Sequence, residues 1–200
     1  MNRSEEIESA GTAAGASEEV LLVFESMFGS TRRIAEAIAD GIRTSLPVGV
    51  YRVADLPSAE GRRLVVVGAP THAHSLSRPE SRAEGRRWAR DRARFALEPG
   101  PHDIGVREWI PVARLSGDSF AAFDTRIDMP WIFTGSAAGA ISKRLRRRGL
   151  REFLPPESFL VDKDSRLLPG EAERAFEWGR TLGAALRAET GDAARRESRS

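Results

Sequence analysis

Hydrophobic residues along the chain form short blocks that alternate with longer amphipathic stretches. Val20 to Phe24 are five consecutive apolar residues, and Leu64 to Val67 form a second, mostly β-branched block. Blocks of this length are typical of strands buried on both faces of a parallel sheet. Between them, Ile34, Ile38 and Ile42 recur every four residues, which is the spacing of an apolar stripe on a helix. The pattern predicts a β-α-β unit with a right-handed crossover.

The rest of the chain continues this alternation. Further strands are predicted at residues 48–56, 119–123 and 158–161, and helices at 105–110, 137–148 and from 168 onward. The side chains expected to face inward from these helices are Trp109, Ile110, Ile141, Leu145, Phe176, Gly179, Leu182 and Leu186. Five strands alternating with helices predict one α/β domain over residues 18–187. Residues 1–17 are expected to be a disordered tail, and residues 188–200 a flexible charged tail.

Composition narrows the classes of function. The 200-residue chain contains no cysteine, which excludes disulfides, cysteine-ligated zinc, iron–sulfur clusters and dithiol chemistry. Electron transfer would therefore need a bound cofactor. No apolar run approaches ~20 residues and the N-terminal sequence lacks the apolar core of a secretory signal, so we expect no membrane span and a cytoplasmic location. A net charge of +2 gives no argument for nucleic-acid binding.

The segment from Glu25 to Thr31, which links the first strand to the first helix, has the chemistry of a phosphate-binding loop. Free N–H groups and the positive dipole end at a helix start favour an anion. The loop adds hydroxyls at Ser26, Ser30 and Thr31, and Gly29 where the backbone must approach closely. It lacks the P-loop lysine and the three glycines of a dinucleotide fingerprint, so a single phosphate monoester suits it. The alternative is a serine-rich turn that only caps the helix.

A second loop follows the strand at residues 64–68 and begins Gly68-Ala69-Pro70-Thr71, whereas the first loop reads Ser26-Met27-Phe28-Gly29-Ser30-Thr31. These motifs, separated by one β-α-β unit, resemble the phosphate loop and the ring-binding loop of the flavodoxin family. The Ser-Met-Phe-Gly segment is similar to the flavodoxin-like quinone reductases. The resemblance implies a three-layer αβα sandwich with a five-stranded parallel sheet in the order 2-1-3-4-5, and this order places both loops at one crevice.

The resemblance also implies a cofactor and a function. We expect FMN to bind non-covalently, in an electron carrier or an FMN-dependent oxidoreductase that reduces small acceptors such as quinones. The implied partners are redox proteins or quinone-like acceptors. The residues expected to hold the phosphate are Ser26, Met27, Phe28, Gly29, Ser30 and Thr31, and those expected around the ring are Pro70, Thr71, His72, Ala73, His74, Ser75, Asp124, Thr125 and Arg126.

The expected ring loop contains no Trp or Tyr at residues 72–75. We expect His72 or His74 to stack on the ring or hydrogen-bond to it, or else to face solvent and cap a turn. The spacing of the two histidines is poor for a metal site. Trp131 and Phe133 are expected either to supply the missing aromatic wall or to join the core.

Asp124 and Arg126 also have two interpretations. Asp124 would accept a hydrogen bond from the ring or the ribityl chain, and Arg126 would balance the charge of the phosphate or of a reduced ring. Alternatively, the two side chains pair with each other or cap the loop.

Two segments are strongly basic. Residues 78–94 are interpreted as a solvated helix in which Trp88 and Ala89 are the candidates for an inward face, or else as an arginine surface for an acidic partner or a nucleotide phosphate. The second segment, Lys143 to Arg148, lies at a predicted helix end, where the dipole favours cations. In a carrier, such surfaces would favour docking on acidic partners.

Two other classes of function remain open from the sequence. A binding or regulatory domain that kept the fold without flavin is favoured by the missing ring aromatics and by Ser75, near where relatives often have glycine. A hydrolase is disfavoured because the chain has neither a Gly-x-Ser-x-Gly elbow nor a His-Glu-x-x-His helix.

Overall fold

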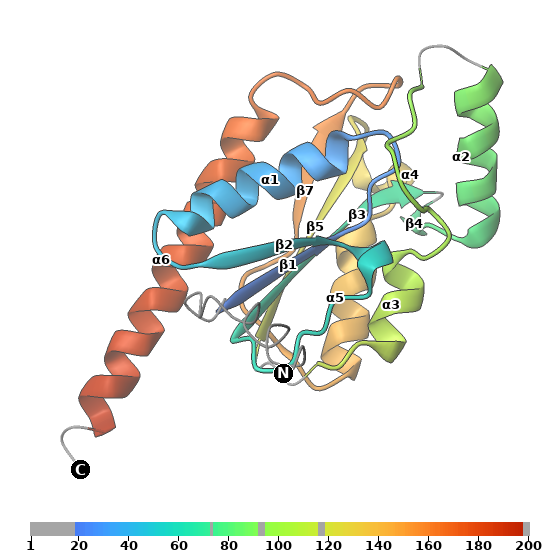
Figure 1. Cartoon of the computed structure of the whole chain (residues 1–200). Helices are drawn as coiled ribbons and strands as arrows, with labels where there is room; N and C mark the ends of the chain where they lie inside the picture. Colours follow the sequence, from blue (N-terminus) through green and yellow to red (C-terminus); the bar gives the residue numbers. More distant parts are fainter. Residues whose placement is uncertain (1–18, 73, 92–94, 116–118, 198–200) are drawn as a thin grey trace, which may run out of the picture.

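The computed structural model describes residues 19–72, 74–91, 95–115 and 119–197. At its centre is a sheet whose five longer strands are parallel (Figure 1). They lie in the order β2 (Val48–Arg52), β1 (Val20–Phe24), β3 (Leu64–His72), β5 (Ser119–Ile127) and β7 (Glu157–Val161). This arrangement confirms the predicted order 2-1-3-4-5. Two short strands were not predicted: β4 (Ser75–Leu76) pairs antiparallel with β3, and β6 (Arg151–Glu152) pairs with the start of β5.

The strand register brings the two predicted loops to one edge of the sheet. Phe24, the last residue of β1, pairs with Gly68, and Gly68 pairs with Phe123. Strands β3 and β5 then continue beyond the end of β1 and pair with each other as far as Pro70 and Thr125. Several residues expected in loops are therefore at the ends of strands, which holds their side chains in fixed positions.

Alternate strand residues pack on opposite faces of the sheet and form two cores. Leu22 and Val66 belong to the core on one face, and Val23 and Val67 to the core on the other. The helices that cover these faces are α1 (Ser30–Arg43) and α6 (Glu171–Glu197) on the first, and α3 (Val106–Val112) and α5 (Ala137–Arg147) on the second (Figure 1). The predicted αβα sandwich is confirmed.

The predicted apolar stripes are buried except at Phe176, which is only half-buried and outside both cores, whereas its neighbour Ala175 is fully buried. The isoleucine stripe of α1 is fully buried, and the inward residues of α3, α5 and α6 include Trp109, Ile110, Ile141, Leu145, Leu182 and Leu186. Gly179 of α6 packs directly on α1, because a Cβ atom there would lie 2.1 Å from the carbonyl oxygen of Ile38. Helix α6 runs to Glu197, whereas the sequence predicted that the chain frays from about residue 187.

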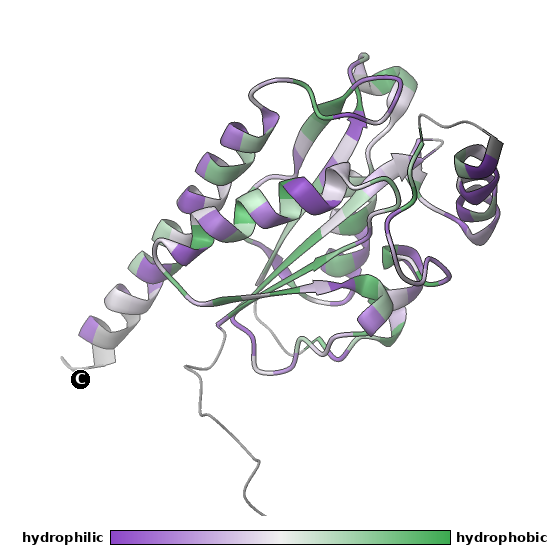
Figure 2. Cartoon of the chain, turned by 45° about the horizontal axis from the view of Figure 1, so that its top comes forward, coloured by the Kyte–Doolittle hydropathy of each residue, from purple (hydrophilic) through white to green (hydrophobic). Residues whose placement is uncertain are grey.

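Two further predictions need correction. The second strand was predicted to extend to residue 56, but β2 ends at Arg52 and the chain enters a 3-10 turn, η1 (Val53–Asp55). Helix α2 (Pro79–Asp91), the hydrophilic helix set apart at one side of the molecule (Figure 2), was interpreted as a solvated helix in which Trp88 and Ala89 were the candidates for an inward face. Its most buried side chain is instead Arg82, which is 2% exposed, whereas Trp88 is 37% exposed.

The remaining helix, α4 (Trp131–Thr134), is a single turn between β5 and α5. None of the described helices combines the length and the apolar character needed to cross a membrane.

Candidate functional site

A pocket of about 260 Å³ opens at the edge of the sheet where β1, β3, β5 and β7 end. Its lining comes from the loops after these strands, from the strand ends and from helix α2. The lining residues are Met27, Phe28, Ser30, Thr31, Pro70, Thr71, His72, Trp88, Phe95, Thr125, Arg126, Ile127, Val161, Lys163 and Ser165. Residues from both predicted loops and from the end of the fourth predicted strand therefore meet at one site.

The backbone of the first loop turns sharply into helix α1 at Gly29. This residue is the N-cap and has φ +93°, in the left-handed region that glycine adopts without steric cost. The first hydrogen bond of the helix runs from Arg33 N to Gly29 O at 3.0 Å. The N–H groups of Ser30, Thr31 and Arg32 therefore have no acceptor within the helix. They form its N-terminal end, beside the pocket.

The hydroxyl groups of this loop have several roles. Ser26 is buried, and its Oγ accepts a hydrogen bond from Gly29 N at 3.2 Å, so it stabilises the turn from within. Ser30 Oγ donates to the carbonyl oxygen of Ser165 at 2.5 Å. Thr31 Oγ1 lies 2.7 Å from Thr125 Oγ1, which links α1 to β5. The alternative in which Ser30 or Thr31 caps the helix is wrong, because Gly29 occupies the N-cap and no side chain caps it.

The second loop contributes Pro70, Thr71 and His72 to the pocket wall. Gly68 at its start is required by packing, because a Cβ atom there would lie 2.0 Å from the Phe123 ring. Burial, with a smaller contribution from the nearby Arg82 charge, lowers the pKa of His72 below its ordinary value of 6.5. His72 is therefore a neutral, planar side chain at neutral pH, as expected from the sequence.

The following residues do not line the pocket. His74 is exposed and has φ +72°, and it forms a backbone bridge to Gly135. Ser75 lies in β4 and pairs with His72. Ala73 lies outside the described residues. The expected ring loop thus reaches the pocket only as far as His72.

Asp124 has a structural role and does not line the pocket. Its side chain is fully buried, and Oδ2 accepts hydrogen bonds from Thr71 Oγ1 at 3.0 Å, Ser136 Oγ at 2.8 Å and Ala138 N at 2.9 Å. Asp124 thereby ties β3 and β5 to the start of α5, which matches the capping alternative. Its neighbours Thr125 and Arg126 do line the pocket, and Arg126 Nη1 donates to Met129 O at 2.7 Å.

Three aromatic side chains line the pocket: Phe28, which was among the predicted site residues, and Trp88 and Phe95, which were not. Phe28 and Phe95 have ring centroids 5.2 Å apart, and the centroids of Trp88 and Phe95 are 6.1 Å apart. Phe133 is exposed and outside the lining, so the expectation that it forms the wall or joins the core is wrong. The side chain of Trp131 lies outside the described part of the chain.

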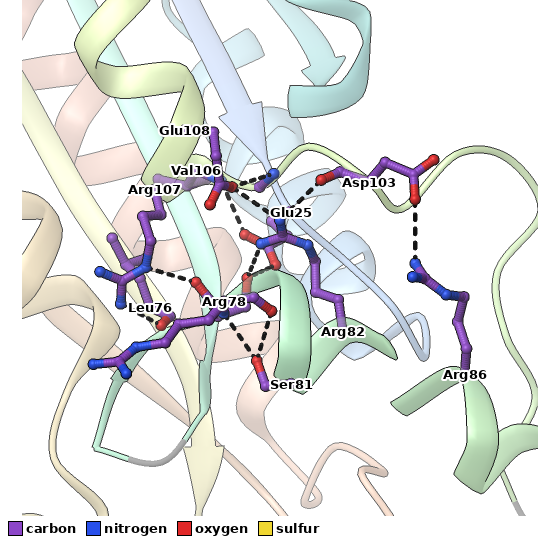
Figure 3. Close-up of polar contacts among 12 residues, drawn as sticks. Glu25, Leu76, Arg78, Ser81, Arg82, Arg86, Asp103, Val106, Arg107 and Glu108 are labelled. Carbon is purple, nitrogen blue, oxygen red and sulfur yellow. Dashed lines mark hydrogen bonds and ion pairs between the residues drawn. The ribbon is translucent and has the colours of Figure 1, made fainter. Parts of the chain in front are cut away.

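A buried polar cluster holds helix α2 beside this pocket (Figure 3). Arg82 Nη1 donates to Ser77 Oγ at 2.8 Å, and Nη2 lies 3.1 Å from Glu108 Oε2. Ser77 Oγ in turn donates to the carboxylate of Glu25, which also accepts from Val106 N at 2.9 Å. Burial raises the pKa of Glu25, and the hydrogen bonds from Ser77 and Val106 oppose that shift. The cluster joins the end of β1 to α2 and α3.

Six lining residues were not among the predicted site residues: Trp88, Phe95, Ile127, Val161, Lys163 and Ser165. Four of them lie at or just after the ends of the fourth and fifth strands. The rule that ligands bind beyond the carboxyl ends of parallel strands could have identified these four. The rule does not identify Trp88 and Phe95, because these residues reach the pocket through the placement of α2 and of the segment after it.

No family model matches the chain, and no curated protein matches it in sequence. Solved structures do match. A flavodoxin from the domain Archaea is 18% identical with a TM-score of 0.58, over 84% of this chain and 98% of that one. The WrbA-like flavodoxin protein from Agrobacterium tumefaciens is 16% identical with a TM-score of 0.54, over 86% and 99%.

Oxidised flavodoxin 2 from Bacillus cereus is 14% identical with a TM-score of 0.55, and the match again covers 86% of this chain and 99% of that one. These matches span nearly the whole length of each solved protein. Together with the strand order and the two helical layers, they show that this chain has the flavodoxin-like fold.

Proposed function

We propose that this protein binds FMN non-covalently in the pocket and acts in electron transfer or in the reduction of small acceptors such as quinones. The observation that carries the proposal is the convergence of a helix N-terminus, two hydroxyl-bearing loop residues and three aromatic rings on one pocket. The start of α1 suits a phosphate, and the aromatic and apolar side chains suit a planar ring. The solved structures that share the fold carry the names flavodoxin and WrbA-like protein, which supports the same proposal.

The chain's own residues would bind and orient the cofactor. The N–H groups at the start of α1, with Ser30 and Thr31, would hold the phosphate. Phe28, Trp88 and Phe95 would exclude water on one side, while neutral His72 would avoid placing a charge beside the ring. Bound FMN would supply the one- and two-electron chemistry that the cysteine-free chain lacks.

The size of the pocket agrees with a ligand that is only partly enclosed. Pockets that enclose a drug-sized ligand usually measure roughly 300–1,000 Å³, whereas this one measures about 260 Å³. A ligand as large as FMN would therefore keep one edge exposed. An exposed edge would let an electron acceptor approach the ring directly.

The first test is a visible absorption spectrum of the purified protein, before and after incubation with FMN and desalting. We expect a retained flavin spectrum. We also expect Ser30→Asp to abolish retention, because it places a carboxylate where the phosphate would lie, and like charges in contact cost several kcal/mol. Ser58→Asp is the control, since Ser58 is exposed and outside the pocket lining. Full flavin content in Ser30→Asp would refute the assignment of this loop.

A second candidate is a binding or regulatory domain without flavin. One observation favours it: the hydroxyls of Ser30 and Thr31 are both engaged within the protein, with Ser165 and Thr125. A colourless protein that also fails to take up added FMN would support this candidate over the redox function.

A further inference from the structure

Two cationic side chains from different strands line the pocket, and they differ in what they contact. Arg126 Nη1 donates to two backbone carbonyls, Met129 O at 2.7 Å and Ile127 O at 3.5 Å. Lys163 is exposed and lines the pocket, and within the described residues its ammonium group makes no hydrogen bond or ion pair. Arg126 therefore keeps its charge but is held on backbone carbonyls. The charge of Lys163 faces the neighbouring Asp162 carboxylate, whose pKa is lowered by backbone hydrogen bonds and in part by Lys163, and Lys163 can reorient toward a ligand.

Lys163 lies on a turn with a rigid backbone. Asp162 Oδ1 accepts hydrogen bonds from Asp164 N and from Arg166 N, both at 2.8 Å. Asp162 N also donates to Arg166 O at 2.9 Å, and Ser165 N donates to Asp162 O at 3.0 Å. These four bonds close the turn around Lys163 and hold its backbone in place.

The same turn contacts the phosphate-type loop. Ser165, two positions after Lys163, accepts a hydrogen bond from Ser30 Oγ at 2.5 Å through its carbonyl oxygen. Ser30 is the first residue of α1, where the free N–H groups lie. Lys163 therefore lies on the turn that contacts the first residue of α1, and it lines the same pocket.

The nearest cation of the loop itself is not available for this role. Arg32 donates through Nε to the carboxylate of Glu98 and through Nη1 to Glu36 Oε1 at 2.8 Å. Its charge is therefore directed toward two carboxylates of the protein. The chain contains 31 Lys and Arg residues, and only Lys143 and Lys163 are lysines. A lysine ammonium group is a compact, strongly hydrated point charge, and one of the two such groups in the chain lies at the pocket.

We propose that Lys163 is a binding residue that selects a phosphorylated ligand over its unphosphorylated counterpart. The inference rests on the proposed function, in which that ligand is FMN and the counterpart is riboflavin. The phosphate carries close to two negative charges at neutral pH, and the loop provides only partial charges from N–H groups and hydroxyls. Lys163 supplies the full positive charge that the loop lacks.

The test compares FMN and riboflavin binding by flavin fluorescence quenching in wild type, Lys163→Gln and Lys143→Gln. Lys143 is an exposed lysine on α5, outside the pocket lining, and is the matched control. We expect Lys163→Gln to weaken FMN binding about tenfold and to leave riboflavin binding within about twofold, because only FMN carries the phosphate. Lys143→Gln should bind both flavins as wild type does.

The outcomes separate this inference from the proposed function. If wild type binds neither flavin, the proposed function fails, and this inference fails with it. If wild type binds FMN and Lys163→Gln binds it equally tightly, only the role of Lys163 is overturned. An equal loss for FMN and riboflavin also overturns it, because it points to a damaged pocket and not to phosphate selection.

Discussion

At the scale of single residues, the pocket depends on side chains whose surroundings set their charge. His72 lines the pocket, and burial together with the Arg82 charge disfavours its imidazolium form. The unfolded chain has no such constraint, so between the lowered pKa and the ordinary value of 6.5 the unfolded state binds more protons at this residue than the folded state. The stability that comes from a neutral His72 is therefore present above about pH 6.5 and decreases as the pH falls.

We predict that the free energy of unfolding of wild type falls relative to that of His72→Asn as the pH is lowered from about 7.5 to 5.5; the comparison isolates His72, because Glu25, whose pKa is raised by burial, contributes with the opposite sign in both proteins. Urea denaturation at a series of pH values measures both. His74→Asn, at an exposed position of the same loop, is the control and should keep the wild-type slope. Identical slopes for His72→Asn and wild type would mean that His72 does not contribute to the pH dependence of stability.

At the scale of elements, helix α2 is attached by a charge network around Arg82 together with the close packing of Gly85 on Met27. Arg82 is its most buried side chain, and it connects to Glu25 through Ser77 and directly to Glu108. The same helix carries Trp88, which lines the pocket. The charge network therefore contributes to the position of one aromatic wall of the site.

We predict that Arg82→Met destabilises the fold by about 3 kcal/mol, because it leaves the buried carboxylate of Glu25 without its cation. Arg87→Met, at an exposed position of the same helix, should change stability by less than about 0.5 kcal/mol. Urea denaturation provides the values. Adding Glu25→Gln to Arg82→Met should recover part of the loss, because the double variant no longer buries an unpaired charge. Absence of any recovery would argue against this coupling.

At the scale of the whole molecule, the basic clusters differ in their position relative to the pocket. Helix α5 begins beside Thr71 at the pocket edge, and its arginine-rich end lies near β6, at the opposite edge of the sheet. Arg148, just after α5, is bound to the carbonyl oxygens of Ile110, Pro111 and Ala113. Helix α2 lies beside the pocket, and its exposed charges are mixed, with Arg87 and Arg90 interspersed with Glu80 and Glu84. Under the proposed function, we expect Arg87 and Arg90 to attract an anionic acceptor to that side.

We predict that the FMN-loaded, reduced protein reacts with ferricyanide, an anionic acceptor, at a rate that falls as ionic strength rises from about 0.01 to about 0.15 M. Charge reversal on α2 (Arg87→Glu with Arg90→Glu) should lower the low-salt rate several-fold, because it removes electrostatic attraction near the pocket. Arg147→Glu, at the far end of α5, should have little effect. Stopped-flow absorbance measures the rates, and equal effects of the two reversals would contradict a local role for α2.

Much of the fold could be predicted from the sequence because its signals are local. The apolar block at 20–24, the isoleucine stripe of α1 and the β-branched block at 64–67 each indicate one element by periodicity alone. The flavodoxin resemblance of the two loops then supplied the strand order, and the solved structures share the same fold. Boundaries were less accurate where pairing with a neighbour extends a strand, as β3 and β5 extend each other.

Which residues form the site depended more on the tertiary structure than on the local sequence. Local sequence placed hydroxyl residues, Pro70 and His72 at one edge, because strand ends in a parallel sheet share that edge. It assigned Asp124 to the pocket, but the fold buries that carboxylate as a cap for α5. It also could not identify Trp88 and Phe95 as pocket residues, because their contacts join segments distant in the chain. The sequence by itself therefore determined the elements and the loop chemistry, whereas long-range packing decided which side chains face the pocket.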